Sequence, residues 1–240
     1  MITMLNTKFS RLLLAGIFVL LFSSAATPMV PTIAKADKKE NSSNSRDYTF
    51  ETHPQMNAVS ANFIKQYLKK NIETLQMVKA KSYSTFKMMD KVFRKYNLPV
   101  ELKYLAVIES ELKPTAVSRV GAVGTWQLMP ETAKILGLKI TMQEDERKST
   151  HKSTRAAAIY LRDLHTEFKD WLIVLAAYNC GPGPVYKAMK KSGSKDFWVL
   201  QKFLPAESRE HVHKFIATHQ YFEAQPISPY INEWKYLATR

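Results

Sequence analysis

Glycine and cysteine are both scarce in this chain of 240 residues, which contains 7 glycines and a single cysteine. Average glycine usage is roughly 7% of residues, more than twice the fraction found here, which disfavours a loop-rich all-β protein. One cysteine excludes an intramolecular disulfide scaffold and any metal site built from several cysteines. Hydrophobic residues make up 45% of the chain and charged residues 23%, and these ordinary values exclude wholesale disorder.

Acidic residues are absent from residues 1–36, which carry a net charge of +3. In this segment Lys8 and Arg11 precede an uncharged apolar run of eleven residues, and small residues follow, among them Ala26 and Ala36. This order is typical of a secretory signal peptide; the alternative, an uncleaved membrane anchor, normally needs about 20 apolar residues. We therefore expect residues 1–36 to be a signal peptide, and the protein to be exported to the periplasm or cell envelope.

The rest of the chain, residues 37–240, keeps a net charge of +11. A basic surface favours polyanions such as nucleic acid, acidic lipid or an anionic wall polymer, although it also simply promotes solubility. The lysines are spread along the chain and no arginine-rich recognition stretch is present. We therefore do not expect nucleic acid as a partner, whereas loose association with a membrane or cell wall fits the charge.

Helical periodicity begins only after a polar stretch. Residues 37–55 lack apolar periodicity and are predicted to be a linker, and residues 56–94 place apolar side chains at helical spacing, which predicts a helical N-terminal extension. The main domain is predicted at 95–225, followed by a C-terminal tail at 226–240. Its helices are expected at 100–112, 131–136, 154–168, 170–179, 183–191 and 206–223. Because no segment shows clean β alternation, the fold class is predicted to be all-α.

Two helix ends can be predicted from single residues. Pro114 is expected to stop the helix over 100–112, because proline interrupts helical hydrogen bonding. Ser153 and Thr154 are expected to cap the helix over 154–168, since hydroxyl side chains accept hydrogen bonds from the first helical N–H groups.

Four of the six glycines beyond residue 36 lie in two short motifs, 121–124 and 181–183. Such clustering in a glycine-poor helical chain predicts unusual backbone or close approach of a ligand, with ordinary interhelix turns as the alternative.

Glu109 follows the uncharged run 104–108. A helix that is apolar on nearly all sides is buried, and both the low dielectric and the negative helix end disfavour an ionised carboxylate there. A carboxyl held in its protonated form is what a general acid needs, although a solvated glutamate is the ordinary alternative. Glu111 lies about 200° further around the helix, so the two are not expected to form a carboxylate pair.

The motifs occur in a specific order. Glu109-Ser110 with Pro114 gives E-S-x-x-x-P, and the series continues with Ala116, Ser118, Gly121-Ala122, Gly124, 126–130, 132–133, 176–179, 181–183, Leu204-Pro205 and Glu207. Over about residues 95–222 this set resembles the catalytic domain of lytic transglycosylases, the glycoside hydrolase family 23 type, and within it the membrane-bound murein enzymes.

The resemblance implies a single lysozyme-like helical domain of the goose type, acting on peptidoglycan glycan strands. Enzymes of this family cleave the β-1,4 bond between N-acetylmuramic acid and N-acetylglucosamine and leave a 1,6-anhydro end instead of adding water. By resemblance Glu109 is the single catalytic acid and base. Neither a metal nor an organic cofactor is expected.

The same resemblance places six residues around the sugar: Ser118, Gln127, Met129, Tyr178, Asn179 and Glu207. Ser118 is expected near the acid and the N-acetyl group, Tyr178 is expected either to hydrogen-bond the acid or to stack on a sugar, and Glu207 is expected to bind or position substrate. Core packing is the alternative for Met129 and Tyr178.

The chain departs from the family pattern at Cys180, where alanine is usual, and after Arg147, where the family's D-E-R-x-D-P pattern is not completed. His211 and His213 lie two residues apart and are expected to point to different faces of a helix, so they form no metal signature. Two other functions remain open from the residues: a hydrolytic goose-type lysozyme and a non-catalytic wall-binding protein.

Overall fold

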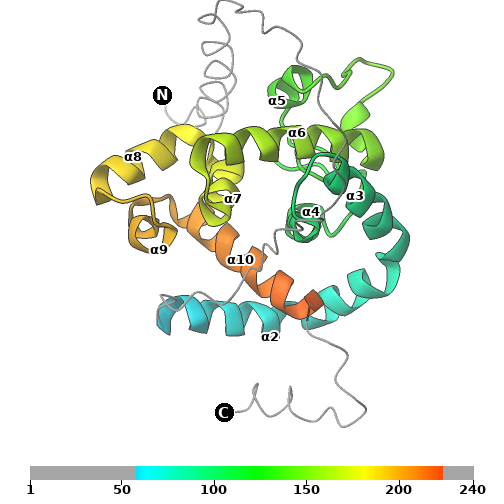
Figure 1. The fold of residues 1–240 in the computed structure, drawn as a ribbon. Helices are drawn as coiled ribbons and strands as arrows, with labels where there is room; N and C mark the ends of the chain where they lie inside the picture. The colour runs from blue at the N-terminus through cyan, green and yellow to red at the C-terminus, as the bar shows by residue number, and fades with distance from the viewer. Residues whose placement is uncertain (1–57, 224–240) are drawn as a thin grey trace, which may run out of the picture.

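The computed structural model describes residues 58–223, and within this range the chain is helical, with isolated bridges in place of strands (Figure 1). The α-helices are α2 (Ala58–Lys81), α3 (Tyr83–Lys95), α4 (Lys103–Ser110), α5 (Pro130–Ile135), α6 (Thr150–Phe168), α7 (Trp171–Cys180), α8 (Pro182–Ser192), α9 (Phe197–Leu200) and α10 (Ala206–Glu223). Short 3₁₀ segments are η2 (Val100–Leu102), η3 (Glu146–Lys148) and η4 (Gln201–Phe203). The all-α prediction is confirmed.

The predicted signal peptide at 1–36, the linker at 37–55 and the tail at 226–240 lie outside the described residues. Helices α2 and most of α3 occupy the stretch predicted as an N-terminal extension, and its boundary with the main domain stays a prediction. From Ala58 to Glu223, no helix combines the length and the apolar character needed to cross a bilayer.

Helix α7 lies at the centre of the core. Its residues 173–177 are fully buried, because the segment is apolar on all sides and packs against α6, α8 and α10. The helix begins where the side chain of Asp170 accepts a hydrogen bond from the backbone N–H of Ile173, at 2.9 Å. It ends at Gly181, whose φ of 78° leads the chain directly into α8.

Helix α10, drawn in orange in Figure 1, connects this core with the N-terminal helices. It packs against α7, α4 and α2. Tyr104 of α4 stacks on Phe222 of α10 with ring centroids 5.0 Å apart, and Phe86 of α3 contacts both rings edge-on. Helices α4 and α10 are therefore held in a fixed relation to each other.

Two predicted helix ends were wrong. Helix α4 ends at Ser110, before Pro114, because Glu111 and Leu112 adopt left-handed backbone with φ of 55° and 65°. The N–H groups of these two residues donate to the carbonyls of Val107 and Ala106, a nested pair of hydrogen bonds that ends the helix without glycine.

Helix α6 begins at Thr150, four residues earlier than predicted. Its N-cap is Ser149, whose side chain accepts from the N–H of Lys152, whereas Ser153 and Thr154 lie inside the first turns and donate to backbone carbonyls. Helix α9 was not predicted, because four apolar residues are too few to distinguish helix from strand by periodicity.

Candidate functional site

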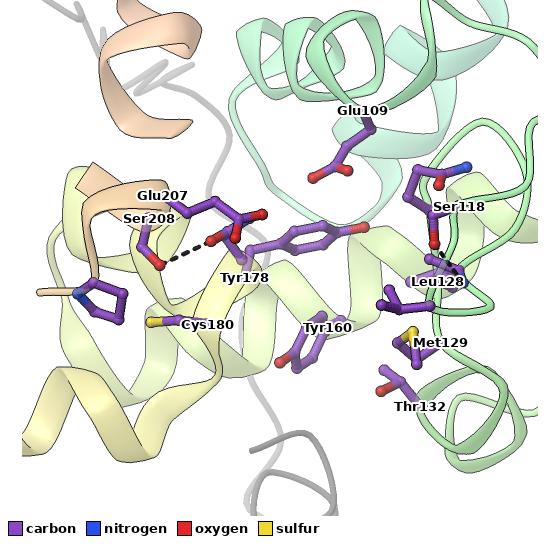
Figure 2. Close-up of a pocket in the computed structure, with 15 residues that line it drawn as sticks. Glu109, Ser118, Leu128, Met129, Thr132, Tyr160, Tyr178, Cys180, Glu207 and Ser208 are labelled. Carbon is purple, nitrogen blue, oxygen red and sulfur yellow. Dashed lines mark hydrogen bonds between the residues drawn. The ribbon is translucent and has the colours of Figure 1, made fainter. Parts of the chain in front are cut away.

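All seven site residues that were predicted from the sequence line one cavity of about 190 Å³ (Figure 2). They come from four parts of the chain: the end of α4, the loop between α4 and α5, the end of α7 and the start of α10. The nominated residues in the lining are Glu109, Ser118, Gln127, Met129, Tyr178, Asn179 and Glu207. Residues that the sequence did not nominate complete it, among them Tyr160 and Ser208.

Glu109 lies near the C-terminal end of α4, in the last turn of a helix whose residues 104–107 are buried. Its side chain is 15% exposed, and its carboxyl group is directed toward the ring of Tyr178 (Figure 2). Glu111, by contrast, is exposed and pairs with Lys113 at 2.6 Å. The prediction that the two glutamates do not form a pair is confirmed.

His211 is the residue that sequence reasoning missed. Its Nε2 lies 2.8 Å from Oε1 of Glu109, within hydrogen-bonding distance, and its side chain is 9% exposed. The other ring nitrogen, Nδ1, is buried and has no hydrogen-bond partner in the described part of the chain. An N–H at Nδ1 would lack an acceptor, so the geometry favours the tautomer in which Nε2 carries the proton and donates to Glu109.

His213 faces elsewhere on α10, as the spacing predicted. Its ring stacks on Trp198 and tilts against Phe63, and burial lowers its pKa to about 4, with a smaller contribution from the charge of Arg209. Between Ala58 and Glu223 no group of three or more His, Cys, Asp or Glu residues is arranged to hold a metal ion.

Tyr178 donates its hydroxyl to the backbone carbonyl of Trp126 at 2.8 Å, and not to Glu109. Burial raises the pKa of Tyr178 well above its ordinary value, and the nearby negative charge of Glu109 adds to this. The hydroxyl is thus a fixed neutral donor that ties α7 to the loop before α5. The resemblance gave two alternative roles for Tyr178, and the first of them, a hydrogen bond to the acid, is not formed.

Ser118 and Gln127 hold the shape of the loop that borders the cavity. Ser118 Oγ accepts from the N–H of Ala122 at 2.9 Å. Gln127 Nε2 donates to the carbonyls of Ala116 and Gly124, which leaves its amide oxygen as the group available to a ligand. Both side chains therefore serve the loop as well as the cavity.

On the opposite wall, α7 and α10 meet through a side-chain hydrogen bond. Ser208 Oγ donates to Oδ1 of Asn179 at 2.8 Å, which leaves the amide N–H₂ of Asn179 to act as a donor. Glu207 precedes Ser208 and is exposed. Cys180 is buried, and its thiol lies 3.5 Å from the carbonyl of Gly181.

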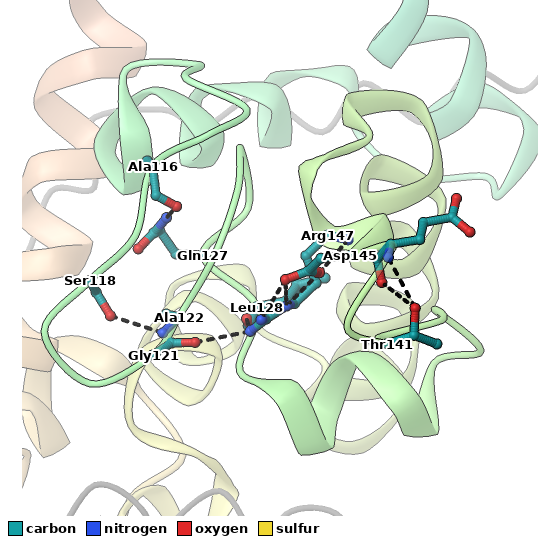
Figure 3. A network of polar contacts seen from close by, with 10 residues as sticks. Ala116, Ser118, Gly121, Ala122, Gln127, Leu128, Thr141, Asp145 and Arg147 are labelled. Atoms are coloured by element: carbon teal, nitrogen blue, oxygen red, sulfur yellow. Dashed lines mark hydrogen bonds and ion pairs between the residues drawn. The ribbon is translucent and has the colours of Figure 1, made fainter.

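The loop of residues 111–129 is pinned from behind by Arg147 (Figure 3). The side chain of Arg147 is 7% exposed, and its guanidinium donates to the carbonyls of Gly121 and Leu128, at 2.9 and 3.1 Å. It also forms a fork-like pair with the carboxylate of Asp145, which holds the pKa of Asp145 below its ordinary value of 3.8. This arrangement forms although the sequence after Arg147 departs from the family pattern.

Gly124 fits directly against the backbone of Arg147. A Cβ added at Gly124 would lie 2.0 Å from the carbonyl oxygen of Arg147, and the glycine has a φ of 84°. Positive φ also occurs at Gly121 and Gly181, which confirms the unusual backbone predicted for these glycines, whereas Gly183 lies in α8 with open space around it.

Comparison with solved structures gives the class of fold. The chain superposes on an inactive glutamate-to-glutamine mutant of lytic transglycosylase Slt from Pseudomonas aeruginosa with a TM-score of 0.50 and 25% identity, covering 57% of this chain and 23% of that one. The lysozyme-like helical fold predicted from the sequence is thereby confirmed.

Sequence comparison gives the family. Residues 87–201 match the Transglycosylase SLT domain. The chain is 41% identical over 129 residues to membrane-bound lytic murein transglycosylase D of Escherichia coli (strain K12), covering 52% of this chain and 28% of that protein. It is 33% identical over 134 residues to membrane-bound lytic murein transglycosylase F of Yersinia pestis (strain Pestoides F), covering 50% of this chain and 26% of that protein. The chain thus spans little more than a quarter of these two relatives, and the likeness to the SLT transglycosylases rests on the domain at residues 87–201.

The contact between Gly124 and Arg147 predicts that alanine lowers the free energy of unfolding more at position 124 than at position 137. Gly137 has a similar φ of 82° but open space around it, so Gly137→Ala should cost only the backbone strain, about 1–2 kcal/mol of unfolding free energy. Gly124→Ala should cost about 1–3 kcal/mol more, because the backbone of Arg147 must also move. Urea denaturation of both variants measures the difference, and equal losses would contradict the close contact.

The pair between Asp145 and Arg147 predicts a dependence of stability on pH. Since the folded-state pKa of Asp145 is lowered, its contribution is present above the unfolded value near 3.8 and is lost as the pH falls through the folded value. Asp145→Asn should cost about 1.5–3 kcal/mol at pH 6, and this cost should shrink toward pH 2.5. The control is Asp163→Asn in the exposed pair with Arg162, which should change stability by less than about 1 kcal/mol. A cost of Asp145→Asn that stays constant with pH would refute the assignment.

Proposed function

We propose that this chain is a peptidoglycan lytic transglycosylase that cleaves the β-1,4 bond between N-acetylmuramic acid and N-acetylglucosamine, with Glu109 as the single acid and base. The observation that carries the proposal is the position of Glu109. Its carboxyl group faces a cavity lined by the family's motif residues, and one of its oxygens is held by His211. The match of residues 87–201 to the SLT domain and the names of the relatives support the same activity.

In the first step Glu109 donates its proton to the glycosidic oxygen, and the bond from that oxygen to C1 of the muramyl sugar breaks. Glu109 is then a carboxylate, and it accepts the proton of the C6 hydroxyl as that oxygen closes on C1. The products are a 1,6-anhydro end and a free N-acetylglucosamine end, and the carboxyl regains its proton. One carboxyl serves both steps, so no water is consumed.

His211 has a defined part in this cycle. An N–H at Nε2 that donates to Oε1 leaves Oε2 to carry the proton toward the sugar. The same donor stabilises the carboxylate formed after the first transfer, because hydrogen bonds to charged groups are stronger than those to neutral ones. His211 thus acts on the sugar only through Glu109, as a positioning residue.

We assign roles to the other predicted site residues from the side-chain groups that they present to a ligand. The amide oxygen of Gln127 and the amide N–H₂ of Asn179 complement the acetamido groups of the substrate, and Met129 offers an adaptable apolar surface. Ser118 is proposed to lie beside the N-acetyl group of the muramyl sugar. Tyr178 is proposed to contact a sugar face, and Glu207 to bind sugar hydroxyls.

The envelope is the proposed location. Two of the relatives are named membrane-bound murein transglycosylases, and a net charge of +11 beyond residue 36 suits a wall polymer rich in carboxylates. Export by a signal peptide at 1–36, with loose attachment to wall or membrane, is part of the same proposal.

Replacement of the proposed acid tests the reaction directly. Glu109→Gln should lower turnover of purified sacculi by about 10²–10⁴-fold, because the amide cannot donate or accept the required proton. Glu101→Gln is the matched control and should retain activity, since Glu101 does not line the cavity. Unchanged turnover in Glu109→Gln would show that another group is the acid.

Mass spectrometry of the wild-type products separates the three candidate functions. Anhydro-muropeptides are lighter by one water than the products of a hydrolytic lysozyme. Hydrated products would identify a goose-type muramidase, and no products at all would identify a non-catalytic wall-binding protein.

The hydrogen bond between His211 and Glu109 predicts a selective loss of turnover. His211→Phe should lower kcat by about 10- to 100-fold, which corresponds to a charge-assisted hydrogen bond of about 1.5–3 kcal/mol, with little change in KM. His211→Gln retains an N–H donor and should recover part of the loss. His213→Phe, two residues away on α10, should leave kcat unchanged. Equal kcat for His211→Phe and His213→Phe would remove His211 from the mechanism.

A further inference from the structure

A second cavity, of about 490 Å³, lies between α2, α4 and α10. It shares no lining residue with the first cavity. Helix α4 contributes Ile108 to it, immediately before Glu109, and α10 contributes Glu210, immediately before His211. The same two helices therefore form part of the wall of both cavities.

Charged side chains of both signs line this second cavity. Lys70 of α2 and Lys214 of α10 bring two ammonium groups, and Glu210 and Glu111 bring two carboxylates. Within residues 58–223 only Glu111 among these four has an ion-pair partner, Lys113. Glu210 and Lys214 lie four residues apart on α10, a spacing at which opposite charges attract, so their charges partly offset each other. Charges of both signs at one cavity fit a ligand that itself carries charges of both signs.

The rest of the lining contains both polar and apolar side chains. Gln66, Asn71 and Thr74 of α2 offer amide and hydroxyl groups, and Leu75 with Val107 forms a buried apolar floor. Hydrogen-bonding groups beside an apolar floor fit a peptide, which offers both a polar backbone and small apolar side chains. Sugars would use the amides and hydroxyls but would leave the charges of both signs unmatched.

We propose that this second cavity binds the peptide branch of the wall polymer, a short peptide that carries carboxylates and a free amine. The inference rests on the proposed function, because the branch is attached to the muramyl sugar that is cleaved in the first cavity. A stem of four residues reaches at most about 14 Å, and the two cavities are lined by consecutive residues of α4, Glu109 in the first and Ile108 in the second. The lysines bind its carboxylates, and Glu210 with Glu111 binds its amine.

This assignment also gives α2 a role. Helix α2 lies entirely before residue 87, where the match to the SLT domain begins, yet it forms one side of the cavity and packs along α10. The helix thus adds specificity for the peptide to a domain whose motif residues concern the sugar.

The test compares two substrates: intact sacculi, and glycan strands from which an amidase has removed the peptides. Lys70→Ala/Lys214→Ala in the full chain should raise KM for peptide-bearing strands by about 5- to 10-fold, because each exposed charge pair contributes up to about 1 kcal/mol. Its activity on peptide-free strands should equal that of the wild type. Lys69→Ala/Lys190→Ala is the control of equal charge, with both lysines outside the cavity, and should behave as wild type on both substrates.

A binding titration keeps this inference separate from the proposed function. The tripeptide L-Ala-γ-D-Glu-diaminopimelate, titrated into the full chain by calorimetry, should bind the wild type and the control at least about 5-fold more tightly than the Lys70/Lys214 variant. Wild-type protein that is inactive on both substrates would refute the proposed function. The titration would then still show whether the second cavity binds the peptide. Equal losses on both substrates would indicate a glycan site, and no loss on either, or equal affinities for the tripeptide, would overturn the proposal.

Discussion

Helix α4 combines burial on nearly every side with a carboxyl group in its last turn. Residues 104–107 fix the helix in the core, so Glu109 has little freedom to move. Glu111 and Leu112 then adopt left-handed backbone and turn the chain away from the helix axis. The side chain of Glu111 therefore does not line the first cavity. The rest of the site is arranged around this one carboxyl: α10 brings His211 to it, and the loop after α4 returns to form the facing wall.

The order of helices was predictable because it depends on apolar spacing within single segments. The ends of the helices were less so, since they depend on hydrogen bonds that residue type alone does not specify. Ser149, not Ser153, caps α6, and both have the same side chain. Two non-glycine residues with positive φ end α4, although Pro114 lies close by and is the usual signal. Local sequence could not distinguish these cases.

The candidate site was predictable to the extent that its residues form ordered motifs, and all seven nominated residues line one cavity. The contact of His211 with Glu109 was not predictable, because it joins positions 102 residues apart through the packing of α10 on α4. The same is true of Tyr178, whose hydroxyl is engaged by Trp126, and of Arg147, whose partners lie in the loop before α5. The roles of these three residues depend on hydrogen bonds to residues that are distant in sequence, and only the packed fold determines which residues those are.

The contact of Gly124 with the carbonyl of Arg147 has an evolutionary consequence. Two segments more than twenty residues apart touch through backbone atoms alone at this point, so neither can accommodate a change by choosing another side chain. A larger residue at position 124 becomes acceptable only if the backbone path at 145–148 changes with it. The loop that borders the first cavity and the segment behind it should therefore diverge together, by insertion or deletion, and not through independent point substitutions.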